Sequence, residues 1–375
     1  MNIFQIMGCT SDQYASLESY LVRKARICKG KGYNLIIGYN NVPKSNEFIK
    51  DLKSEGAHLY KLEANTFFDL SFCITFSKIV KNHKIDVLHA YFAPTRHYAI
   101  IAAWLLGIKK RYRQCANMPL ANNRKAGMSF KLFSLKHQLL SWFATKYICR
   151  SNAVKHQYEQ LGLNSNKLRV ADGGTDTERY KRKEINRKDF LPDMYDNYLI
   201  GTASRLVKGK GIDILIDAVE LLILKGSKIV CLILGDGPER GNLEKTVNEK
   251  QLNKYVLFLG HKSNLEDYYN LLDIFISASF SEGMSNSILE ALACERPVIV
   301  SDIEPNKEII NVAAKSNLYI GEVFRTGNKY DLAEKIELLL SDKNRGSIGE
   351  KARTVILNNY SVDERIIKEI EIYQQ

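Results

Sequence analysis

The sequence has no hydrophobic run long enough to span a bilayer and no pair of cysteines spaced to bind a metal. The longest apolar stretch, 98–108, is too short for a membrane helix. Seven cysteines are scattered singly, and none forms a Cys-x2-Cys pair. The first residues lack the basic region that opens a signal peptide. We therefore expect a cytoplasmic protein with reduced thiols and no zinc site, which does not exclude peripheral contact with a membrane.

Acidic residues are missing from one part of the chain. Residues 101–150 contain ten Lys or Arg and no Asp or Glu. Residues 1–150 hold 23 Lys and Arg against 8 Asp and Glu, a net charge of +15, whereas the remainder carries −3. This asymmetry indicates an anionic partner for the first half of the chain.

The length and the alternating pattern predict two α/β domains. A chain of 375 residues is long for a single core. Short apolar runs alternate with helical patterns, as in a doubly wound parallel sheet, where ligands bind at the carboxyl ends of the strands. The expected strands are 2–7, 33–39, 57–62, 85–90, 111–115, 147–149, 168–171, 198–202, 228–234, 256–260, 273–277 and 298–301. The expected helices include 17–29, 71–82, 93–107, 286–294, 331–341 and 360–373.

The segment 280–301 carries the clearest chemical signal. A loop containing Glu282 precedes a helix, 286–294, and a buried strand follows. The free N–H groups and the positive dipole end of that helix can hold a diphosphate. Glu290, about one turn inside, can accept from the two hydroxyls of a diol, and Glu282 can face the other end of the same ligand. The helix dipole alone explains either glutamate taken singly, but together they describe a site for a sugar nucleotide.

The two glutamates and their context resemble the Glu-x7-Glu segment of the retaining glycosyltransferases of the group 1, or GT4, type in the glycogen-synthase-like superfamily. Segment 204–211, with Arg205 and Lys210, resembles the Gly-Arg-Leu-x-x-x-Lys-Gly motif of the same family. A solvated basic turn is the alternative for that segment. Segment 235–241 is nearly a dinucleotide fingerprint, but its glycine spacing differs, and it resembles instead the Gly-x-Gly-Pro turn of this family.

The resemblance implies the GT-B architecture, in which two Rossmann-like domains with parallel sheets face each other across a cleft. Segment 172–180 resembles the end of the first domain in the family, so we expect domains at 1–180 and 198–358, with a polar linker at 181–197. The final segment, 359–375, resembles the helix that crosses back onto the first domain.

The resemblance also implies roles for individual residues. Glu282, Arg205 and Lys210 would be catalytic, with no metal, because the sequence contains no Asp-x-Asp triplet. No cofactor is implied beyond the sugar nucleotide itself. The donor would be bound by Glu290, Gly8, Gly283, Met284, Ser285, Asn286, Ser287, Gly260 and His261.

Two positions in the first half are weaker candidates for contacts with the acceptor or the sugar. His89 lies near the end of the fourth expected strand, but Tyr91 stands where relatives often have a second histidine. Asn117 occupies the place of another histidine of the family, and an amide cannot exchange protons near neutral pH. Gly8 would let the backbone approach a ligand closely, although a plain turn is an equal alternative.

Two other functions remain open at this point. A sugar-nucleotide 2-epimerase would use a similar cleft, and a non-enzymatic RNA-binding protein would explain the basic first half, although no RNA-binding signature is present. Segment 124–150 adds a basic amphipathic pattern, in which apolar residues recur at three- and four-residue steps among lysines. This helix is expected to pack on the sheet, to contact an anionic membrane, or to do both, since the apolar stripe is broad. Contact with a membrane would favour a lipid-linked glycan acceptor in cell-surface polysaccharide synthesis.

Overall fold

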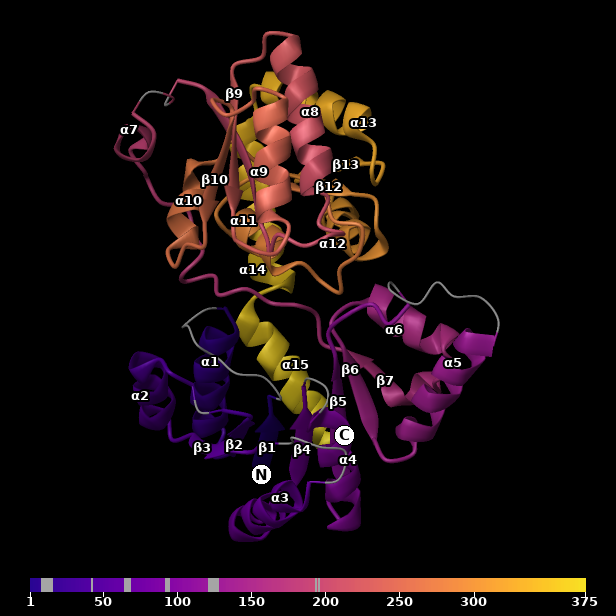
Figure 1. Cartoon of the computed structure of the whole chain (residues 1–375). Coiled ribbons are helices and arrows are strands. Elements are labelled where there is room, and N and C mark those ends of the chain that lie inside the picture. Colours follow the sequence, from indigo (N-terminus) through magenta and orange to yellow (C-terminus); the bar gives the residue numbers. More distant parts are fainter. Residues whose placement is uncertain are drawn as a thin grey trace. The chain divides into compact units, whose positions relative to one another are not determined.

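The chain folds into two compact units, each built on a parallel sheet (Figure 1). The first unit comprises Met1–Asp172 and Val362–Gln375, and the second comprises Gly173–Ser361. The computed structural model describes residues 1–7, 16–41, 43–63, 69–91, 95–120, 128–192, 194 and 196–375.

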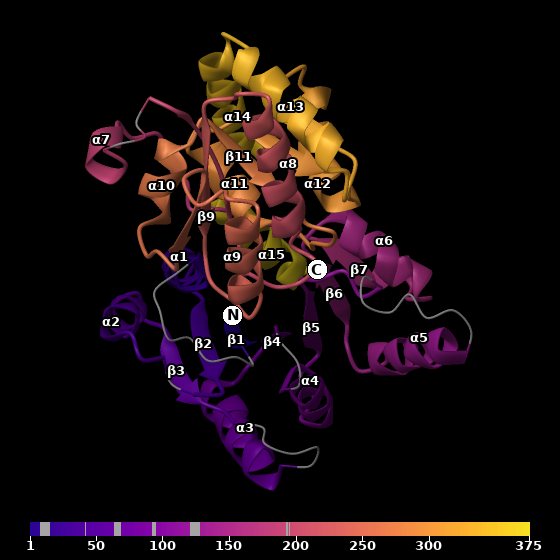
Figure 2. The same ribbon diagram turned by 45° about the horizontal axis from the view of Figure 1, so that its top comes forward.

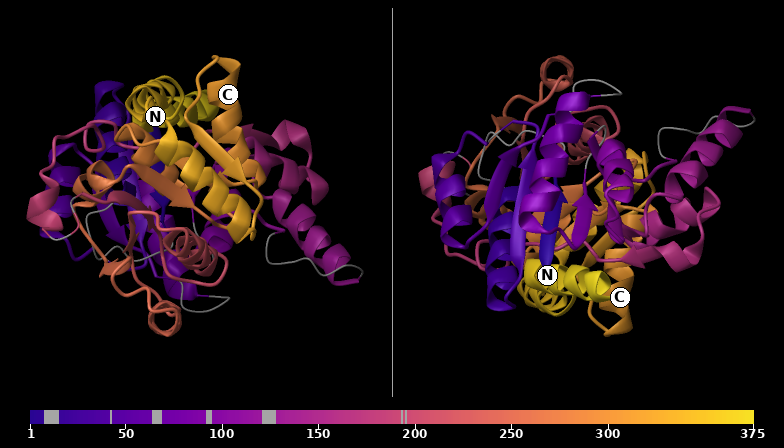
Figure 3. Two further views of the ribbon diagram at one scale, coloured as in Figure 1. Left: turned by 90° about the horizontal axis from the view of Figure 1, so that it is seen from above. Right: turned by 90° about the horizontal axis from the view of Figure 1, so that it is seen from below.

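The first unit is a seven-stranded sheet with the order β3-β2-β1-β4-β5-β6-β7 among the described residues. Helices α3, α4, α5 and α6 cover one face, and α1, α2 and α15 cover the other (Figure 3). The strands are β1 Asn2–Ile6, β2 Asn34–Tyr39, β3 His58–Lys61, β4 Val87–Ala90, β5 Lys110–Cys115, β6 Lys146–Cys149 and β7 Leu168–Val170. The helices are α1 Ser16–Gly30, α2 Asn46–Ser54, α3 Leu70–His83, α4 Thr95–Leu105, α5 Met128–Ser141, α6 Asn152–Gln160 and α15 Val362–Gln374, with a 3-10 turn at Ser165–Lys167.

The second unit is a six-stranded sheet with the order β10-β9-β8-β11-β12-β13. Helices α8, α9 and α13 cover one face, with α8 and α13 side by side in Figure 2, and α10, α11, α12 and α14 cover the other. The strands are β8 Tyr198–Ala203, β9 Ile229–Leu234, β10 Val256–Gly260, β11 Ile274–Ser277, β12 Val298–Ser301 and β13 Gly321–Phe324. The helices are α7 Arg187–Phe190, α8 Ile212–Leu224, α9 Arg240–Glu249, α10 Leu265–Leu271, α11 Asn286–Ala293, α12 Glu304–Lys315, α13 Lys329–Ser341 and α14 Arg345–Asn359.

Every expected strand is present within two residues of its expected ends, and strand β13 was missed. That strand is short, begins with glycine and lies at the edge of its sheet, so its apolar pattern is too brief to stand out. Strand β9, by contrast, is buried along its whole length, which is the pattern of a central parallel strand.

Two expectations about segments need correction. Residues 181–197, expected to be a linker, belong to the second unit: the amide of Lys183 donates to Asn270 at 3.0 Å, and Arg187 donates to the carbonyl of Leu271 at 2.8 Å. The amphipathic segment 124–150 is not one helix, because α5 ends at Ser141 and Lys146 already lies in strand β6. Helix α15 packs on the first unit.

Candidate active site

The strand order of the second sheet reverses between β8 and β11, and this is where doubly wound sheets bind ligands. Lys210 lies in the loop after β8, and Glu282 lies in the loop after β11. The two side chains form an ion pair at this point. Ser279 donates a hydrogen bond to the same carboxylate oxygen of Glu282 at 2.9 Å. Two of the residues expected to be catalytic are therefore brought together from opposite sides of the reversal.

Arg205 lies at the start of the same loop, two residues after β8 ends. Its side chain is exposed, and it forms no ion pair with the residues that the structure describes. The guanidinium group is thus accessible to an anion beside Lys210, which is half-buried. Together they place two cations at the carboxyl end of β8, where their charges would favour a diphosphate.

Glycines let the loops of this edge pack backbone to backbone. Gly211 has φ +65°, and a side chain there would clash with the carbonyl of Ala278, just after β11. Gly235 has φ +117°, and a side chain there would clash with the carbonyl of Ser204, just after β8. The amide of Phe280 also donates to the carbonyl of Gly209 at 2.8 Å. These contacts hold the loop that carries Arg205 and Lys210 against its neighbours. Such close packing requires glycine at positions 211 and 235, because a larger residue would not fit.

Helix α11 begins next to this pair. Ser285 is its N-cap residue with extended backbone, but its hydroxyl lies 3.1 Å from the Ser287 hydroxyl instead of capping the helix. Asn286 and Ser287 are half-buried in the first turn, and Gly283 is buried just before it. Met284 packs in the hydrophobic core, so only its backbone is available to a donor.

Glu290 lies one turn further along α11 and is 4% exposed. Its carboxylate accepts a hydrogen bond from the hydroxyl of Tyr269, on α10, at 2.9 Å. Burial first, and the charge of Glu290 second, raise the pKa of Tyr269 well above its usual value, so the phenol stays a donor. A carboxylate has about four acceptor positions, so this contact leaves capacity for a diol. Tyr269 gave no signal in the sequence, because a single tyrosine on a short helix has no motif.

Gly260 ends β10 with φ +68°, and its carbonyl accepts from the amide of Gly235 at 2.8 Å. His261 follows it with an exposed side chain. Both residues therefore lie at the same carboxyl edge as the Lys210–Glu282 pair, at the end of β10, which is two strands away from β8. Their contact with a nucleotide base stays a prediction.

The two described candidates of the first unit, His89 and Asn117, lie in different surroundings. His89 is fully buried in β4, and its Nδ1 lies 2.6 Å from the hydroxyl of Tyr373 on α15. Burial lowers the pKa of His89 to about 3, so its imidazole is neutral at pH 7. Asn117 is exposed after the end of β5. Gly8 lies outside the described residues. His89 thus has a structural contact in the interior, and its contact with a sugar stays a prediction.

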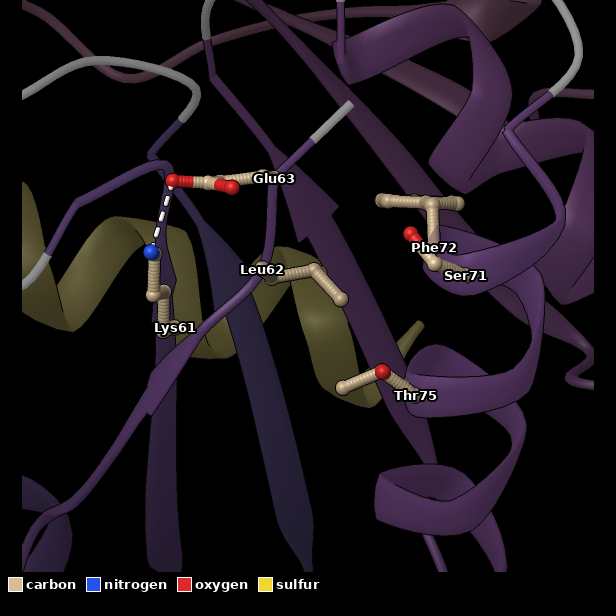
Figure 4. Close-up of a pocket in the computed structure, with 6 residues that line it drawn as sticks. All are labelled: Lys61, Leu62, Glu63, Ser71, Phe72 and Thr75. Atoms are coloured by element: carbon tan, nitrogen blue, oxygen red, sulfur yellow. Dashed lines mark ion pairs between the residues drawn. The ribbon is translucent and has the colours of Figure 1, made fainter. Parts of the chain in front are cut away.

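A separate pocket opens in the first unit between the end of β3 and helix α3 (Figure 4). An ion pair of 2.9 Å joins Lys61 and Glu63 at its rim. Leu62 lies beside them, and Ser71, Phe72 and Thr75 of α3 face them from the other side. This pocket includes none of the catalytic or binding residues that were predicted from the sequence.

Comparison with known proteins decides the family. The family described as "Glycosyl transferases group 1" matches residues 182–355, and the one described as "Glycosyltransferase Family 4" matches residues 17–179. The chain belongs to the group 1, or family 4, glycosyltransferases. The family predicted from the Glu282-x7-Glu290 pattern is therefore confirmed, and the matched ranges cover both units.

Individual glycosyltransferases are similar to this chain over different shares of their length. A capsular polysaccharide biosynthesis glycosyltransferase of Staphylococcus aureus is 27% identical over 248 residues, which cover 63% of this chain and 63% of that protein. An N,N'-diacetylbacillosaminyl-diphospho-undecaprenol alpha-1,3-N-acetylgalactosaminyltransferase of Campylobacter jejuni is 26% identical over 334 residues, which cover 85% of this chain and 84% of that protein.

Solved structures show the same fold. A glycosyltransferase from Rickettsia africae has a TM-score of 0.77 at 22% identity, with 100% of this chain and 98% of that chain covered. An Anabaena protein solved in complex with UDP and glucose has a TM-score of 0.80 at 19% identity, with 100% and 99% covered. The predicted fold class, GT-B with two Rossmann-like parallel sheets, is confirmed.

Two features are absent from the described residues. No three or more His, Cys, Asp and Glu side chains gather there in a way that could hold a metal ion. Among the same residues, no helix combines the length and the apolar character needed to cross a membrane.

Proposed function

We propose that this glycosyltransferase moves a sugar from a nucleoside diphosphate sugar to a hydroxyl of a glycan or lipid-linked glycan, with retention of the anomeric configuration. The observation that carries the proposal is the Lys210–Glu282 pair at the strand-order reversal of the second sheet. A cation for the diphosphate and a carboxylate for the sugar lie side by side there, where doubly wound sheets bind their ligands.

The chemistry follows from the charges at this edge. As the bond to the sugar breaks, negative charge grows on the leaving diphosphate, and Arg205, Lys210 and the first turn of α11 would stabilise it without a metal ion. Glu282 would orient the donor sugar, and Glu290 would accept from the ribose hydroxyls. Among the described residues no side chain stands out as a covalent nucleophile. We therefore propose that the acceptor hydroxyl attacks the same face of the sugar from which the leaving group departs.

The proposed acceptor belongs to cell-surface polysaccharide synthesis. The Staphylococcus aureus relative is named for capsular polysaccharide biosynthesis, and the name of the Campylobacter jejuni relative includes a diphospho-undecaprenol-linked sugar. An acceptor carried on a lipid requires an enzyme that works at a membrane surface. We therefore propose a cytoplasmic enzyme at the inner face of the plasma membrane, which binds sugar nucleotides and glycans and has no nucleic-acid partner.

The surface of helix α5 supports this location. The apolar stripe read from the sequence splits into two arcs, because Phe130, Phe133 and Phe143 pack against the core while the other arc faces solvent. The exposed arc consists of Leu132, Leu135, Leu139 and Trp142, of which Trp142 is 83% exposed. Leu105 of α4 is also exposed, and Trp104 of α4 contacts Phe143 edge to face at 5.3 Å. The exposed arc thus offers apolar side chains to a bilayer, with exposed Lys131 and Lys136 beside them.

Vesicle sedimentation tests the membrane contact. We expect the protein to co-sediment with vesicles that contain anionic lipid, and much less at high salt, because exposed charges are screened over about 10 Å at 0.1 M. Changing Lys125, Lys131 and Lys136 to Gln should release the protein. The matched control changes Lys245 and Lys254, exposed lysines of the second unit, and should leave sedimentation unchanged. Equal recovery in the supernatant with neutral and anionic vesicles at low salt would rule out this location.

A panel of sugar nucleotides tests the activity. We expect one nucleotide to be hydrolysed slowly without an acceptor, with release of the nucleoside diphosphate, because water can take the place of the acceptor hydroxyl. An epimerised sugar nucleotide formed without acceptor would point to a 2-epimerase instead. Salt-sensitive RNA binding without any hydrolysis of the panel would overturn the proposal.

A further inference from the structure

One arginine of the second unit joins a distant segment of the chain to the loop and the helix that follow β10. Arg179 lies just after the crossing from the first unit, and its side chain is 25% exposed. Its Nε donates to the carboxylate of Glu266, on α10, at 3.1 Å. Its Nη2 donates to the carbonyl of Ser263, in the loop between β10 and α10. A single side chain therefore restrains both the loop and the helix.

The turn that carries Arg179 is held by hydrogen bonds of its own. The side chain of Asp176 accepts from the amides of Glu178 and Arg179, at 3.1 and 3.2 Å, as aspartate does in tight turns. The amide of Tyr180 donates to the carbonyl of Asp176 at 2.8 Å. Arg353, on α14, donates to the carbonyl of Tyr180 at 3.0 Å. The backbone on both sides of Arg179 is thus restrained, which limits how far its side chain can move.

The loop between β10 and α10 is short and contains the positions that are expected to contact the nucleotide base. Gly260 ends β10, His261 follows it, and Ser263 lies two residues further on. In so short a loop, the position of one carbonyl group limits the positions of its neighbours. The hydrogen bond from Arg179 to Ser263 therefore also restrains Gly260 and His261.

Helix α10 also carries the residue that contacts Glu290. Glu266 and Tyr269 are three positions apart on α10, hence on one face of the helix. Tyr269 donates to the carboxylate of Glu290 at 2.9 Å. The ring of Tyr269 packs edge to face with that of Tyr180, with 5.9 Å between centroids, and the guanidinium of Arg179 lies 5.3 Å from the Tyr180 ring. Arg179 therefore restrains Tyr269 both through the helix and through Tyr180.

The charge of Arg179 acts in the same place. Burial by itself lowers the pKa of Arg179, but its neighbours raise that pKa by more. Tyr180 and Glu266 are the strongest of these neighbours, and Glu290 also contributes. Arginine suits this position, because its planar group can donate to two acceptors and lie against an aromatic ring at the same time, which the compact ammonium group of lysine does less well.

We propose that Arg179 is a positioning residue for the nucleoside half of the donor. It holds the loop after β10 for the base and, through Tyr269, the carboxylate of Glu290 for the ribose. The diphosphate stays with Arg205 and Lys210. This inference rests on the proposed function, since it takes the donor to be a sugar nucleotide.

Calorimetry with UDP, GDP, ADP and CDP, and with inorganic pyrophosphate, tests this role. We expect Arg179→Gln to weaken binding of the preferred nucleoside diphosphate about tenfold, which corresponds to about 1.4 kcal/mol. Pyrophosphate has neither base nor ribose and should bind within about twofold of its wild-type affinity. The preference among the four bases should also narrow, because the loop after β10 is no longer restrained. Arg179→Lys should restore part of the affinity, since lysine keeps the charge beside Glu266 but not the second contact with Ser263.

Arg182→Gln is the matched control. It removes the same charge three residues away, where Arg182 pairs at the surface with Glu295, just after α11, at 3.4 Å. Binding of nucleoside diphosphates should not change in this variant.

A second variant covers the case in which Arg179→Gln loses its fold, which a loss of pyrophosphate binding would reveal. Glu266→Gln removes the ion pair from the other side and leaves the hydrogen bond from Arg179 to Ser263. It should weaken nucleoside diphosphate binding about threefold and leave pyrophosphate binding unchanged.

Unchanged nucleoside diphosphate affinity in both Arg179→Gln and Glu266→Gln would overturn the positioning role and leave the proposed function standing. An equal loss of affinity for pyrophosphate and for nucleoside diphosphates in Glu266→Gln would overturn it too, because the change would then act on the whole donor site. A wild-type protein that binds pyrophosphate but none of the four nucleoside diphosphates would refute the proposed function itself, and this inference with it.

Discussion

Replacing Lys24 by methionine should destabilise the first unit strongly. Lys24 and Glu369 are both fully buried and 2.8 Å apart, and Lys24 also donates to the hydroxyls of Tyr20 and Tyr373, at 3.0 and 2.8 Å. Methionine fills a similar volume but leaves the carboxylate with one cation instead of two. Removing one partner of a buried ion pair costs about 3–5 kcal/mol. For a unit of this size that lowers the melting temperature by roughly 6–20 °C.

Tryptophan fluorescence during urea unfolding measures the loss of stability of the first unit specifically. Both tryptophans of the chain, Trp104 and Trp142, lie in the first unit, so their signal reports its unfolding. Arg26→Met is the matched control on the same helix, because Arg26 pairs with Glu55 at the surface at 2.9 Å. Breaking an exposed pair of this kind costs about 0–1 kcal/mol.

A double variant tests whether Lys24 and Glu369 act as a pair. Lys24→Met with Glu369→Gln should lower the free energy of unfolding by less than the sum of the two single changes, with a difference of about 0.5–3 kcal/mol. The reason is that the second change removes the buried charge that the first change left without its lysine partner. A cost of Lys24→Met below about 1 kcal/mol, with additive effects in the double variant, would refute the buried network.

The same network makes the first unit sensitive to acid. Burial by itself raises the pKa of Glu369, but Lys24 and Arg365 lower that pKa by more, to well below its usual range. The stabilisation is present above the unfolded pKa of about 4.3 and is lost as the pH falls toward the folded pKa. His89 acts in the same direction from about pH 6.5 downward, because it is protonated in the unfolded chain and neutral in the folded one. The Glu369→Gln variant should therefore show a flatter loss of stability below pH 4 than the wild type.

Three further outcomes concern the active site. Alanine at Arg205 or at Lys210 should weaken nucleoside diphosphate binding in calorimetry and slow turnover; unchanged affinity in both would show that they form only a solvated turn. Activity should survive EDTA, and loss that magnesium or manganese restores would refute a metal-independent reaction. Tyr269→Phe should destabilise the second unit by about 1–3 kcal/mol and weaken binding of the sugar nucleotide, because the buried Glu290 loses a hydrogen bond. An unchanged melting temperature in circular dichroism, together with unchanged affinity for the sugar nucleotide, would show that Tyr269 does not position Glu290.

The sheets could be predicted because parallel strands buried on both faces appear as separate apolar runs, as in β9. The donor site was predictable for a related reason. Lys210 and Glu282 each lie in a short loop after such a strand, and both loops carry sequence motifs of the family. The sequence could not show that these two side chains pair, because the pairing depends on the strand order β8-β11.

Other features depend on tertiary packing that leaves no local pattern. Lys24 and Glu369 are 345 residues apart, and each looks like an ordinary charged position on an amphipathic helix. Periodicity identified the apolar stripe of α5 but not its orientation, because apolar residues occupy both arcs of the helix. Only the structure shows that Phe133 packs inward while Leu135 and Leu139 face outward.

The turnover of the Glu290→Gln variant tests most directly whether the carboxyl edge of the second sheet binds the donor. Glutamine keeps the size of the side chain but removes its charge, and a hydrogen bond to a charged group contributes about 1.5–3 kcal/mol. We expect a loss of turnover of roughly 10- to 150-fold on the sugar nucleotide that the wild type uses, with an unchanged circular-dichroism spectrum. Turnover within about threefold of the wild type, less than 1 kcal/mol of barrier, would contradict it.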